Sequence, residues 1–313
     1  MTTYDFDPEL AAAIPMLPVG DYDDLAVARA QFDEIVRALP APDTSGLWIE
    51  ERRVAGPHGA PEITLRIYRP ERQAVRGAVY DIHGGGFFLG NLDLDHLVNV
   101  ELARELDVVV VSVDYRLAPE TPFPGGLEDV YAGLVWTAEH AAELGIDVNR
   151  IAVYGVSAGG GLAVALALLA RDRGGPPIAF QFLAVPELDD RLDTPSMHAF
   201  TDTPLWNRPA AVRSWNAYLG TGLPGGADVS PYAAPARATD MRGLPPAYVS
   251  VMQFDPLRDE GIAYAQALLA AGVTVELHLF PGTFHGSMLI RDAAISRREA
   301  DEAIVVLRNV FGR

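Results

Sequence analysis

A chain of 313 residues, 49% of them hydrophobic and 21% charged, has enough apolar side chains to bury the core of one large domain or of two small ones. Its 42 acidic residues outnumber its 24 basic ones, and the formal net charge of -18 disfavours binding to nucleic acid or to anionic membrane surfaces. The chain contains no lysine and no cysteine, which excludes a Schiff-base lysine, a P-loop lysine, a thiolate nucleophile and cysteine-ligated metal sites.

The start of the chain does not look like a targeting signal. Its first ten residues contain three acidic residues and no basic one, whereas a signal peptide begins with basic residues. The later apolar run from Leu162 to Ala170 is much shorter than the ~20 residues that span a bilayer. We therefore expect a cytoplasmic protein that acts on a small molecule, with neither a membrane nor nucleic acid as partner.

Residues 25–39 have the periodicity of an amphipathic helix, which Pro40 and Pro42 end. The apolar side chains of this helix fall on one stripe, formed by Leu25, Ala28, Phe32, Ile35, Val36 and Leu39. Because this stripe must be buried, we expect the segment to cross the top of a sheet as part of a cap.

Apolar runs typical of strands follow, several of them after a helical stretch. They lie at residues 63–70, 78–85, 107–116, 150–157, 179–185, 247–255 and 273–282. The run 107–116 is apolar on both faces, as in a parallel strand that helices cover on both sides. The alternation predicts an α/β fold with a doubly wound, mostly parallel sheet.

Residues 187–226 interrupt this alternation and fit no strand, which predicts a second part of the cap. The aromatic side chains of this insert are Phe200, Trp206, Trp215 and Tyr218. We expect a single domain over residues 1–313. Its cap would comprise about 1–45 and 187–226, and its core about 46–186 and 227–313.

Ser157 occupies the middle of the run from Gly155 to Gly159, between the strand predicted at 150–156 and a helix predicted at 158–170. A serine at such a junction sits on a strained turn that exposes its hydroxyl above the sheet, as a nucleophile requires. The same pattern fits a glycine-rich turn in which the serine only caps the helix. The partners that follow in the chain favour the nucleophile.

A serine nucleophile needs a histidine base, and the base needs a carboxylate that orients it. His285 and Asp255 fit these roles because each follows a predicted strand at the carboxyl edge of the sheet. His278 falls inside the last predicted strand, where we expect a structural role. Asp259 and Glu260 are alternatives for the acid, but both should lie in a helix and point away.

The glycine run after the strand at 78–83 can supply backbone amides that stabilise negative charge on a carbonyl oxygen. The amide of Ala158, next to the serine, would add another donor. We expect His83 and Gly84 to shape this loop. A phosphate-binding loop is the alternative, which the missing lysine and the net charge disfavour.

With these motifs the chain resembles the hormone-sensitive-lipase-like (bacterial family IV) carboxylesterases of the α/β-hydrolase superfamily. The matching segments, in the family's order, are His83 to Phe87, Asp114 to Glu120, Gly155 to Gly160, Asp255 to Glu260 and Phe284 to Gly286. The resemblance implies an eight-stranded, mostly parallel sheet with a helical cap and no cofactor or metal. It also implies hydrolysis of short- to medium-chain acyl esters.

The resemblance assigns the oxyanion hole to the amides of Gly85, Gly86 and Ala158, and it suggests a homodimer. Two positions depart from the commonest family form, which has Asp in place of Val156 and Asn in place of Gly161. Neither departure removes a catalytic atom, but the loss of a carboxylate at Val156 should change the hydrogen bonds behind the serine.

Side chains of the loops and the cap are expected to line the substrate pocket. We name Phe87, Phe88, Leu205, Trp206 and Leu257 for this role. The segment 114–120 has no obvious acid or base, and we expect its Tyr115, Arg116 and Glu120 to form a buried brace beneath the glycine loop.

Three classes of function fit the sequence: an esterase, a serine amidase or peptidase on the same fold, and a ligand receptor without catalysis. The presence of His285 argues against a receptor. We expect no separate N-terminal propeller domain, which argues against an oligopeptidase. The esterase is the prediction that we carry forward.

Overall fold

The computed structural model describes residues 4–17, 24–39 and 41–312, and one eight-stranded sheet runs through them. Its strands are β1 (Leu47–Val54), β2 (Ile63–Pro70), β3 (Ala78–Ile82), β4 (Val109–Asp114), β5 (Ile151–Val156), β6 (Phe180–Ala184), β7 (Ala247–Phe254) and β8 (Val275–Phe284). Their order in the sheet is β1-β2-β4-β3-β5-β6-β7-β8. The pairs β1–β2 and β2–β4 are antiparallel and the others are parallel, so the predicted eight-stranded, mostly parallel sheet is confirmed.

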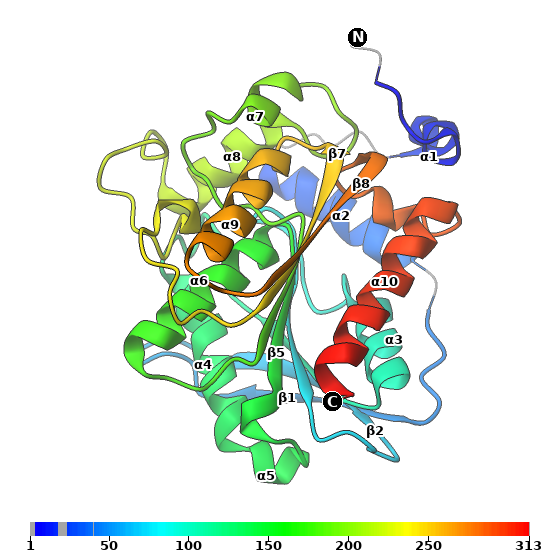
Figure 1. Ribbon diagram of the computed structural model, residues 1–313, viewed down its shortest axis with the longest axis vertical. Coiled ribbons are helices and arrows are strands. Elements are labelled where there is room, and N and C mark those ends of the chain that lie inside the picture. Colours follow the sequence, from blue (N-terminus) through cyan, green and yellow to red (C-terminus); the bar gives the residue numbers. More distant parts are fainter. Residues whose placement is uncertain (1–3, 18–23, 40, 313) are drawn as a thin grey trace.

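Helices cover both faces of the sheet (Figure 1). On one face lie α4 (Gly125–Glu139), α6 (Ala158–Arg173) and α9 (Arg258–Ala270), and on the other lie α3 (His96–Leu106) and α10 (Ala294–Phe311). Short helical pieces connect the larger elements: α5 (Ala141–Leu144), η1 (Ile14–Met16), η2 (Val148–Arg150), η3 (Pro235–Arg237) and η4 (Ser287–Leu289). This is the doubly wound arrangement that the strand and helix alternation predicts.

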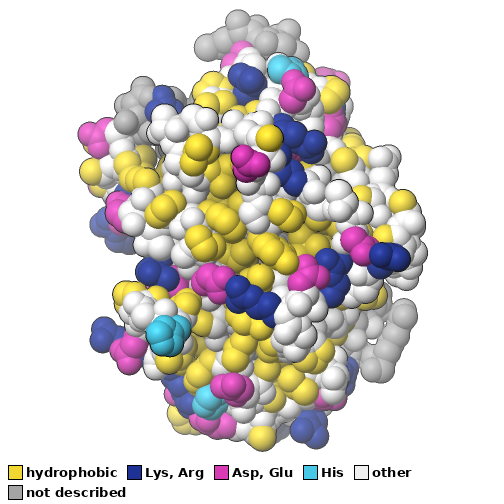
Figure 2. All heavy atoms as spheres, turned by 90° about the vertical axis from the view of Figure 1, so that its left-hand side faces the viewer, with side chains coloured by type: hydrophobic (Ala, Val, Ile, Leu, Met, Phe, Trp, Pro, Cys, Tyr) yellow, Lys and Arg dark blue, Asp and Glu magenta, His cyan; other side chains and the backbone are white. Residues whose placement is uncertain are grey.

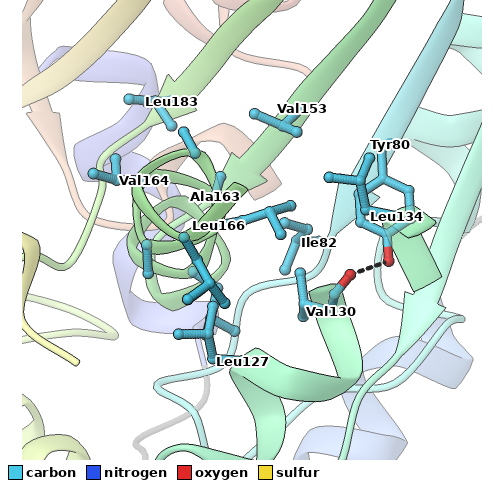
Figure 3. Close-up of a cluster of buried hydrophobic side chains, with 14 of the residues drawn as sticks. Tyr80, Ile82, Leu127, Val130, Leu134, Val153, Ala163, Val164, Leu166 and Leu183 are labelled. Atoms are coloured by element: carbon cyan, nitrogen blue, oxygen red, sulfur yellow. Dashed lines mark hydrogen bonds between the residues drawn. The ribbon is translucent and has the colours of Figure 1, made fainter. Parts of the chain in front are cut away.

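The largest core cluster joins β3, β5 and β6 to α4 and α6 (Figure 3). From α4, Leu127, Val130 and Leu134 recur at helical spacing and face the sheet. Every residue of α6 from Ala158 to Ala170 is buried, so this helix is apolar all round. The hydroxyl of Tyr80 donates to the carbonyl oxygen of Val130 at 2.8 Å and anchors α4 over β3.

Four helices lie near the carboxyl ends of the strands, at the top of Figure 1 or just below it. They are α1 (Pro8–Ala13), α2 (Leu25–Ala38), α7 (Pro195–Ala199) and α8 (Arg208–Leu219). Five of the six stripe residues lie on α2 and the sixth, Leu39, directly follows it. All six are buried or half-buried, and Ala28 packs with Phe88, Leu89 and Trp206. Pro40 lies outside the described residues. The division into a cap and a core stays a prediction.

The strand at β1 is the element that the sequence pattern misses. Its central residues, Glu50 to Arg53, are all charged, because an edge strand with much of its surface in water needs few apolar side chains. The predicted strand 78–85 is too long, since β3 ends at Ile82 before the glycine loop. The strand predicted at 273–282 instead ends at Phe284, directly before His285.

Charges of opposite sign lie together on the surface. On the face shown in Figure 2, arginine and acidic side chains adjoin one another around a band of hydrophobic side chains. Arg173 pairs with Glu128 at 2.6 Å, and Arg237 pairs with the buried Asp190 at 2.5 Å. Among the described residues, no helix combines the length and the apolar character needed to cross a bilayer.

The contact between α4 and β3 leads to a prediction about Gly133. Replacement of a helix glycine by alanine usually stabilises a protein by about 1 kcal/mol. Here the new Cβ would lie 2.2 Å from the Tyr80 hydroxyl oxygen, so we expect Gly133→Ala to lower the free energy of unfolding by about 2 kcal/mol. Urea denaturation measures this change in the free energy of unfolding. In a Tyr80→Phe background, which lacks the hydroxyl, Gly133→Ala should lower the free energy of unfolding by less. A more stable Gly133→Ala protein would contradict this packing.

Candidate active site

Ser157 forms a sharp elbow between β5 and α6, with φ of 60° and ψ of -122°. A Cβ atom on Gly155 would lie 2.3 Å from the Gly159 carbonyl oxygen, and one on Gly159 would lie 1.9 Å from the Ile82 carbonyl oxygen. Only glycine therefore allows β3, β5 and α6 to approach so closely. This elbow is the local structure that the Gly-x-Ser-x-Gly pattern predicts.

The structure brings Ser157, His285 and Asp255 into one line of hydrogen bonds. The Ser157 hydroxyl and His285 Nε2 are 2.9 Å apart, and His285 Nδ1 and Asp255 Oδ2 are 2.8 Å apart. Asp255 and His285 follow the neighbouring strands β7 and β8, so both side chains emerge at the same sheet edge. The Leu257 amide donates to the other Asp255 oxygen at 2.8 Å and holds the carboxylate in place.

The alternative acids and the alternative base lie elsewhere. Asp259 accepts hydrogen bonds from the Ser196 amide and from Arg258, both at 2.8 Å. Glu260 accepts from the amides of Leu188 and Asp189. His278, within β8, pairs with Glu302 on α10. None of these groups makes a hydrogen bond to His285.

The amides of Gly85, Gly86 and Ala158 are oriented by the carbonyl groups that precede them. In a trans peptide the N–H points opposite to the C=O of the same unit, so a held carbonyl fixes the direction of the next amide. The Gly84 carbonyl accepts from His83 Nδ1 at 2.8 Å. The Gly85 carbonyl accepts from two amides of its own loop, and the Ser157 carbonyl accepts from two amides at 3.0 Å.

Within the described chain, these three amides donate no hydrogen bond to another protein group. The glycine loop packs directly on the elbow, because a Cβ atom on Gly84 would lie 2.9 Å from the Val156 carbonyl oxygen and 3.6 Å from Ser157 Cβ. Unpaired backbone donors beside a serine hydroxyl can stabilise negative charge on a bound carbonyl oxygen.

His83 is fully buried under the loop and stacks on Tyr115, with ring centroids 4.2 Å apart. Burial lowers the pKa of His83 to about 4, so the imidazole is neutral at neutral pH and donates through Nδ1. The Tyr115 hydroxyl donates to the His83 carbonyl at 2.9 Å, which supports the expected brace.

The rest of the expected Tyr115-Arg116-Glu120 brace is wrong. Arg116 forms a two-pronged ion pair with Asp129 on α4. The side chain of Glu120 is 60% exposed and pairs with Arg29 of α2. A sequence cannot show which carboxylate an arginine reaches, because both partners here come from other segments of the chain.

Two of the predicted pocket residues, Leu205 and Trp206, lie over the predicted catalytic side chains. The ring centroids of Trp206 and His285 are 5.7 Å apart. The Trp206 ring also packs against Gly86, because a Cβ atom on Gly86 would lie 2.5 Å from that ring. Leu205 packs against Gly286, because a Cβ atom on Gly286 would lie 2.9 Å from the Leu205 side chain. Under this cover Ser157 is only 6% exposed and His285 8%.

The other predicted pocket residues are buried around the glycine loop. Phe87 stacks on Tyr218 at 4.1 Å, and Phe88 and Leu257 pack in one cluster with Trp206. As substrate contacts, all five pocket residues stay predictions. A hollow of about 440 Å³, lined in part by Arg29 and Arg116, does not include the predicted catalytic residues.

Backbone strain gathers at this site. Among the described non-glycine residues, six have positive φ, and Phe87, Ser157, Val185 and Leu205 are four of them. All four adjoin the glycine loop, the elbow or the segment above them. A residue keeps such an unfavourable backbone conformation only when the surrounding packing holds it there, as is common at functional sites.

Sequence reasoning missed two buried polar side chains, Ser214 and Glu187. The Ser214 hydroxyl donates to the Gly86 carbonyl at 2.9 Å. Glu187 is fully buried, and burial, with help from the nearby Asp255, raises the pKa of its carboxyl to about 8. An acid shortly after an apolar strand was a visible signal for Glu187, whereas nothing in the sequence marks Ser214.

Comparison with known proteins identifies the family. A family model described as the alpha/beta hydrolase fold matches residues 79–289. The chain belongs to the alpha/beta hydrolase family. It is 42% identical over 292 residues to carboxylesterase NlhH of Mycobacterium tuberculosis, covering 90% of this chain and 88% of the relative. It is 34% identical over 315 residues to ethyl acetate hydrolase of Pseudomonas putida, covering 96% of each.

Among solved structures, this hydrolase resembles a bacterial heroin esterase with a TM-score of 0.96 and 53% identity, over 98% of both chains. The predicted membership among carboxylesterases of the α/β-hydrolase superfamily is therefore confirmed, and the protein is a carboxylic ester hydrolase. Within the described residues, no group of three or more His, Asp or Glu side chains could hold a metal ion.

One departure from the commonest family form has a steric reason in this hydrolase. A Cβ atom on Gly161 would lie 2.1 Å from the Glu187 carbonyl oxygen, so α6 and the segment after β6 meet at a glycine. Val156, where the family usually has Asp, is half-buried and packs among apolar side chains of β7 and β8 and their neighbours. A carboxylate would lose these contacts.

We expect the substitution Gly161→Asn, which restores the common family residue, to destabilise this hydrolase. The clash with the Glu187 carbonyl involves backbone that cannot swing away, and overpacking of this kind costs about 1 to 3 kcal/mol. Gly174→Asn is the matched control, because Gly174 ends the same helix with open space around it and a φ of 61° that Asn tolerates. Thermal unfolding compares the two, and equal melting temperatures would contradict the expected clash.

Proposed function

We propose that this carboxylic ester hydrolase uses Ser157 as nucleophile, His285 as general base and then general acid, and Asp255 to orient the imidazole. The continuous line of hydrogen bonds from Ser157 Oγ to Asp255 carries the proposal. A serine hydroxyl is a weak nucleophile until a base removes its proton, and a carboxylate on Nδ1 leaves Nε2 free to accept that proton.

In the first step Ser157 Oγ attacks the ester carbonyl carbon while its proton moves to His285 Nε2. The carbonyl oxygen becomes an anion, for which the amides of Gly85, Gly86 and Ala158 form the proposed oxyanion hole. The intermediate then collapses, and the leaving alkoxide takes the proton from Nε2 and departs as an alcohol. An acyl group stays on Ser157.

In the second step a water molecule attacks the acyl-enzyme and gives its proton to His285 Nε2. Collapse of the new intermediate breaks the bond to Oγ, which recovers the proton, and a carboxylic acid leaves. No redox change occurs and no cofactor takes part, so the chain's own residues suffice for each step.

We propose small esters with short- to medium-chain acyl groups as substrates. The cover of Leu205 and Trp206 over the catalytic side chains supports this, because it leaves little room for a long chain beside the serine. The relative from Pseudomonas putida is named ethyl acetate hydrolase, and ethyl acetate is a short-chain ester. A cytoplasmic location, a homodimer, and the absence of nucleic acid and membrane partners stay proposals of the same standing.

The choice between Asp255 and Asp259 gives a direct prediction. Asp255→Asn presents a donor to Nδ1 and favours the wrong tautomer, so we expect kcat to fall by about 10³- to 10⁴-fold. Asp259→Asn is the matched control and should cost less than about tenfold, because Asp259 holds Ser196 and Arg258 instead of His285. Steady-state kinetics on one ester decides, and equal losses would refute the assignment.

A panel of p-nitrophenyl esters from acetate to palmitate, with matching anilides, tests the reaction class and the acyl length. We expect kcat/KM to peak at roughly two to eight carbons and the anilides to react far more slowly. Ser157→Ala should lose about 10⁴-fold or more, and an organophosphate should label Ser157 in mass spectrometry. A palmitate optimum would refute the acyl length, and comparable anilide turnover would favour an amidase.

A further inference from the structure

A buried polar chain runs from the crossover after β6, through α8, to the glycine loop. Ser214 is fully buried on α8, and its hydroxyl donates to the Gly86 carbonyl at 2.9 Å. The carboxyl of Glu187 lies beside the same hydroxyl and interacts with it. Yet neither oxygen of Glu187, which is fully buried, has a well-formed hydrogen bond within the described chain.

The number of hydrogens explains this pattern. A serine hydroxyl has one hydrogen to donate and lone pairs to accept. The Ser214 hydrogen is used on the Gly86 carbonyl, so none is left for Glu187. A protonated Glu187 can instead donate its own hydrogen to the free lone pairs of Ser214, which completes a chain from Glu187 through Ser214 to Gly86.

This chain ends on a residue of the glycine loop. Gly86 has φ of 59°, its amide is one of the proposed oxyanion donors, and its carbonyl has the Ser214 hydroxyl as partner. If that carbonyl were released, the Gly86–Phe87 peptide unit could rotate, and the loop that carries the proposed oxyanion amides would lose one of the hydrogen bonds that hold it. Preorganised donors stabilise an oxyanion because they need not reorient during the reaction.

We propose that Ser214 and Glu187 are positioning residues that together hold the oxyanion loop, with Glu187 acting through the hydroxyl of Ser214 and only while it carries a proton. The proposal rests on the proposed function, since it concerns the donors of that reaction. Neither residue touches the reacting atoms in it.

The surroundings of Glu187 determine at which pH this device works. The ionisable groups that face it are Asp255, which follows β7, and Glu260 on α9. A negative charge on Asp255 disfavours one on Glu187, and burial, with help from Glu187, raises the pKa of Glu260 well above its usual range. From α6, Gly161 lies against the Glu187 backbone and no side chain before Arg171 can ionise, and α8 contributes the Ser214 hydroxyl. With a pKa of about 8, Glu187 is protonated at neutral pH and ionises above about pH 8.

Ionised Glu187 would compete for the single hydrogen of Ser214, and the Gly86 carbonyl would lose its partner. The wild-type enzyme should therefore lose kcat along a one-proton alkaline limb with a midpoint near pH 8. Glu187→Gln carries an amide that donates to Ser214 at every pH. We expect this variant to lose less than about fivefold in kcat at pH 7 and to lack that limb.

Ser214→Ala removes the link itself. We expect kcat to fall about tenfold at pH 7 with KM changed less than threefold, and the alkaline limb to disappear as well. Ser214→Thr keeps a hydroxyl and should recover most of kcat, which separates the hydrogen bond from packing. Glu299→Gln is the matched control. The pKa of Glu299 is also raised to about 8, but this residue lies on α10, which contributes no residue to the candidate active site. The pH profile of Glu299→Gln should therefore match that of the wild type.

The experiment is a kcat and KM profile from pH 6 to 10 for the wild type and these four variants, with circular dichroism to confirm folding. An unchanged limb in Glu187→Gln, or an unchanged kcat in Ser214→Ala, would overturn the inference. If Ser214→Ala does not fold, Glu187→Gln and Ser214→Thr still decide it. Organophosphate labelling of Ser157 is read separately: with the label present, an unchanged limb refutes this device alone, and with the label elsewhere the proposed function fails too.

Discussion

Ser157 keeps its unusual backbone conformation because α6 begins directly where β5 ends, and the rest of the site is arranged around that close contact. Glycines at Gly155 and Gly159 let the helix start touch β3 and its own strand. The Ser157 carbonyl then accepts from the amides of Gly161 and Glu187, which ties the crossover after β6 to the elbow. A side chain at either glycine would push the serine away from the sheet edge where His285 and Asp255 emerge.

Hydrogen bonds hold the glycine loop from several directions, as the proposed stabilisation of an oxyanion requires. From below, His83 fixes the Gly84 carbonyl. From the helices above the sheet, Arg29 of α2 donates to the Phe88 carbonyl and Ser214 of α8 donates to the Gly86 carbonyl. The sequence predicted α2 and α8 as parts of a cap, and both also hold the glycine loop through these hydrogen bonds. In the proposed mechanism, these contacts would contribute to catalysis by keeping the donor amides from having to reorient.

The parts of this enzyme that follow from local pattern were predictable, and the parts that depend on long-range pairing were not. Apolar runs predicted seven of the strands. The order of Ser157, Asp255 and His285 in the chain predicted three candidate residues, which the fold joins by hydrogen bonds. The edge strand β1 was missed because its middle is charged. Ser214 was missed because a serine within a helix has no periodic or motif signal, and its importance arises only where α8 meets the glycine loop. The pairing of Glu120 with Arg29 likewise needs knowledge of where α2 lies.

The buried carboxyls should make the fold less stable as the pH rises. The proposed chain from Glu187 to Gly86 would lower activity over the same direction of pH. Burial raises the pKa of Asp81 to about 6 and that of Glu187 to about 8, above the values of about 4 expected in the unfolded chain. The folded state therefore holds protons that the unfolded state releases, and its net charge at neutral pH is less negative than the formal -18. Between the unfolded and folded pKa values, each such group lowers the free energy of unfolding by about 1.4 kcal/mol per pH unit as the pH rises. Stability from these groups is fully present below about pH 4 and is lost up to about pH 8, so a buried acid such as Glu187 is tolerated at neutral pH because it stays protonated.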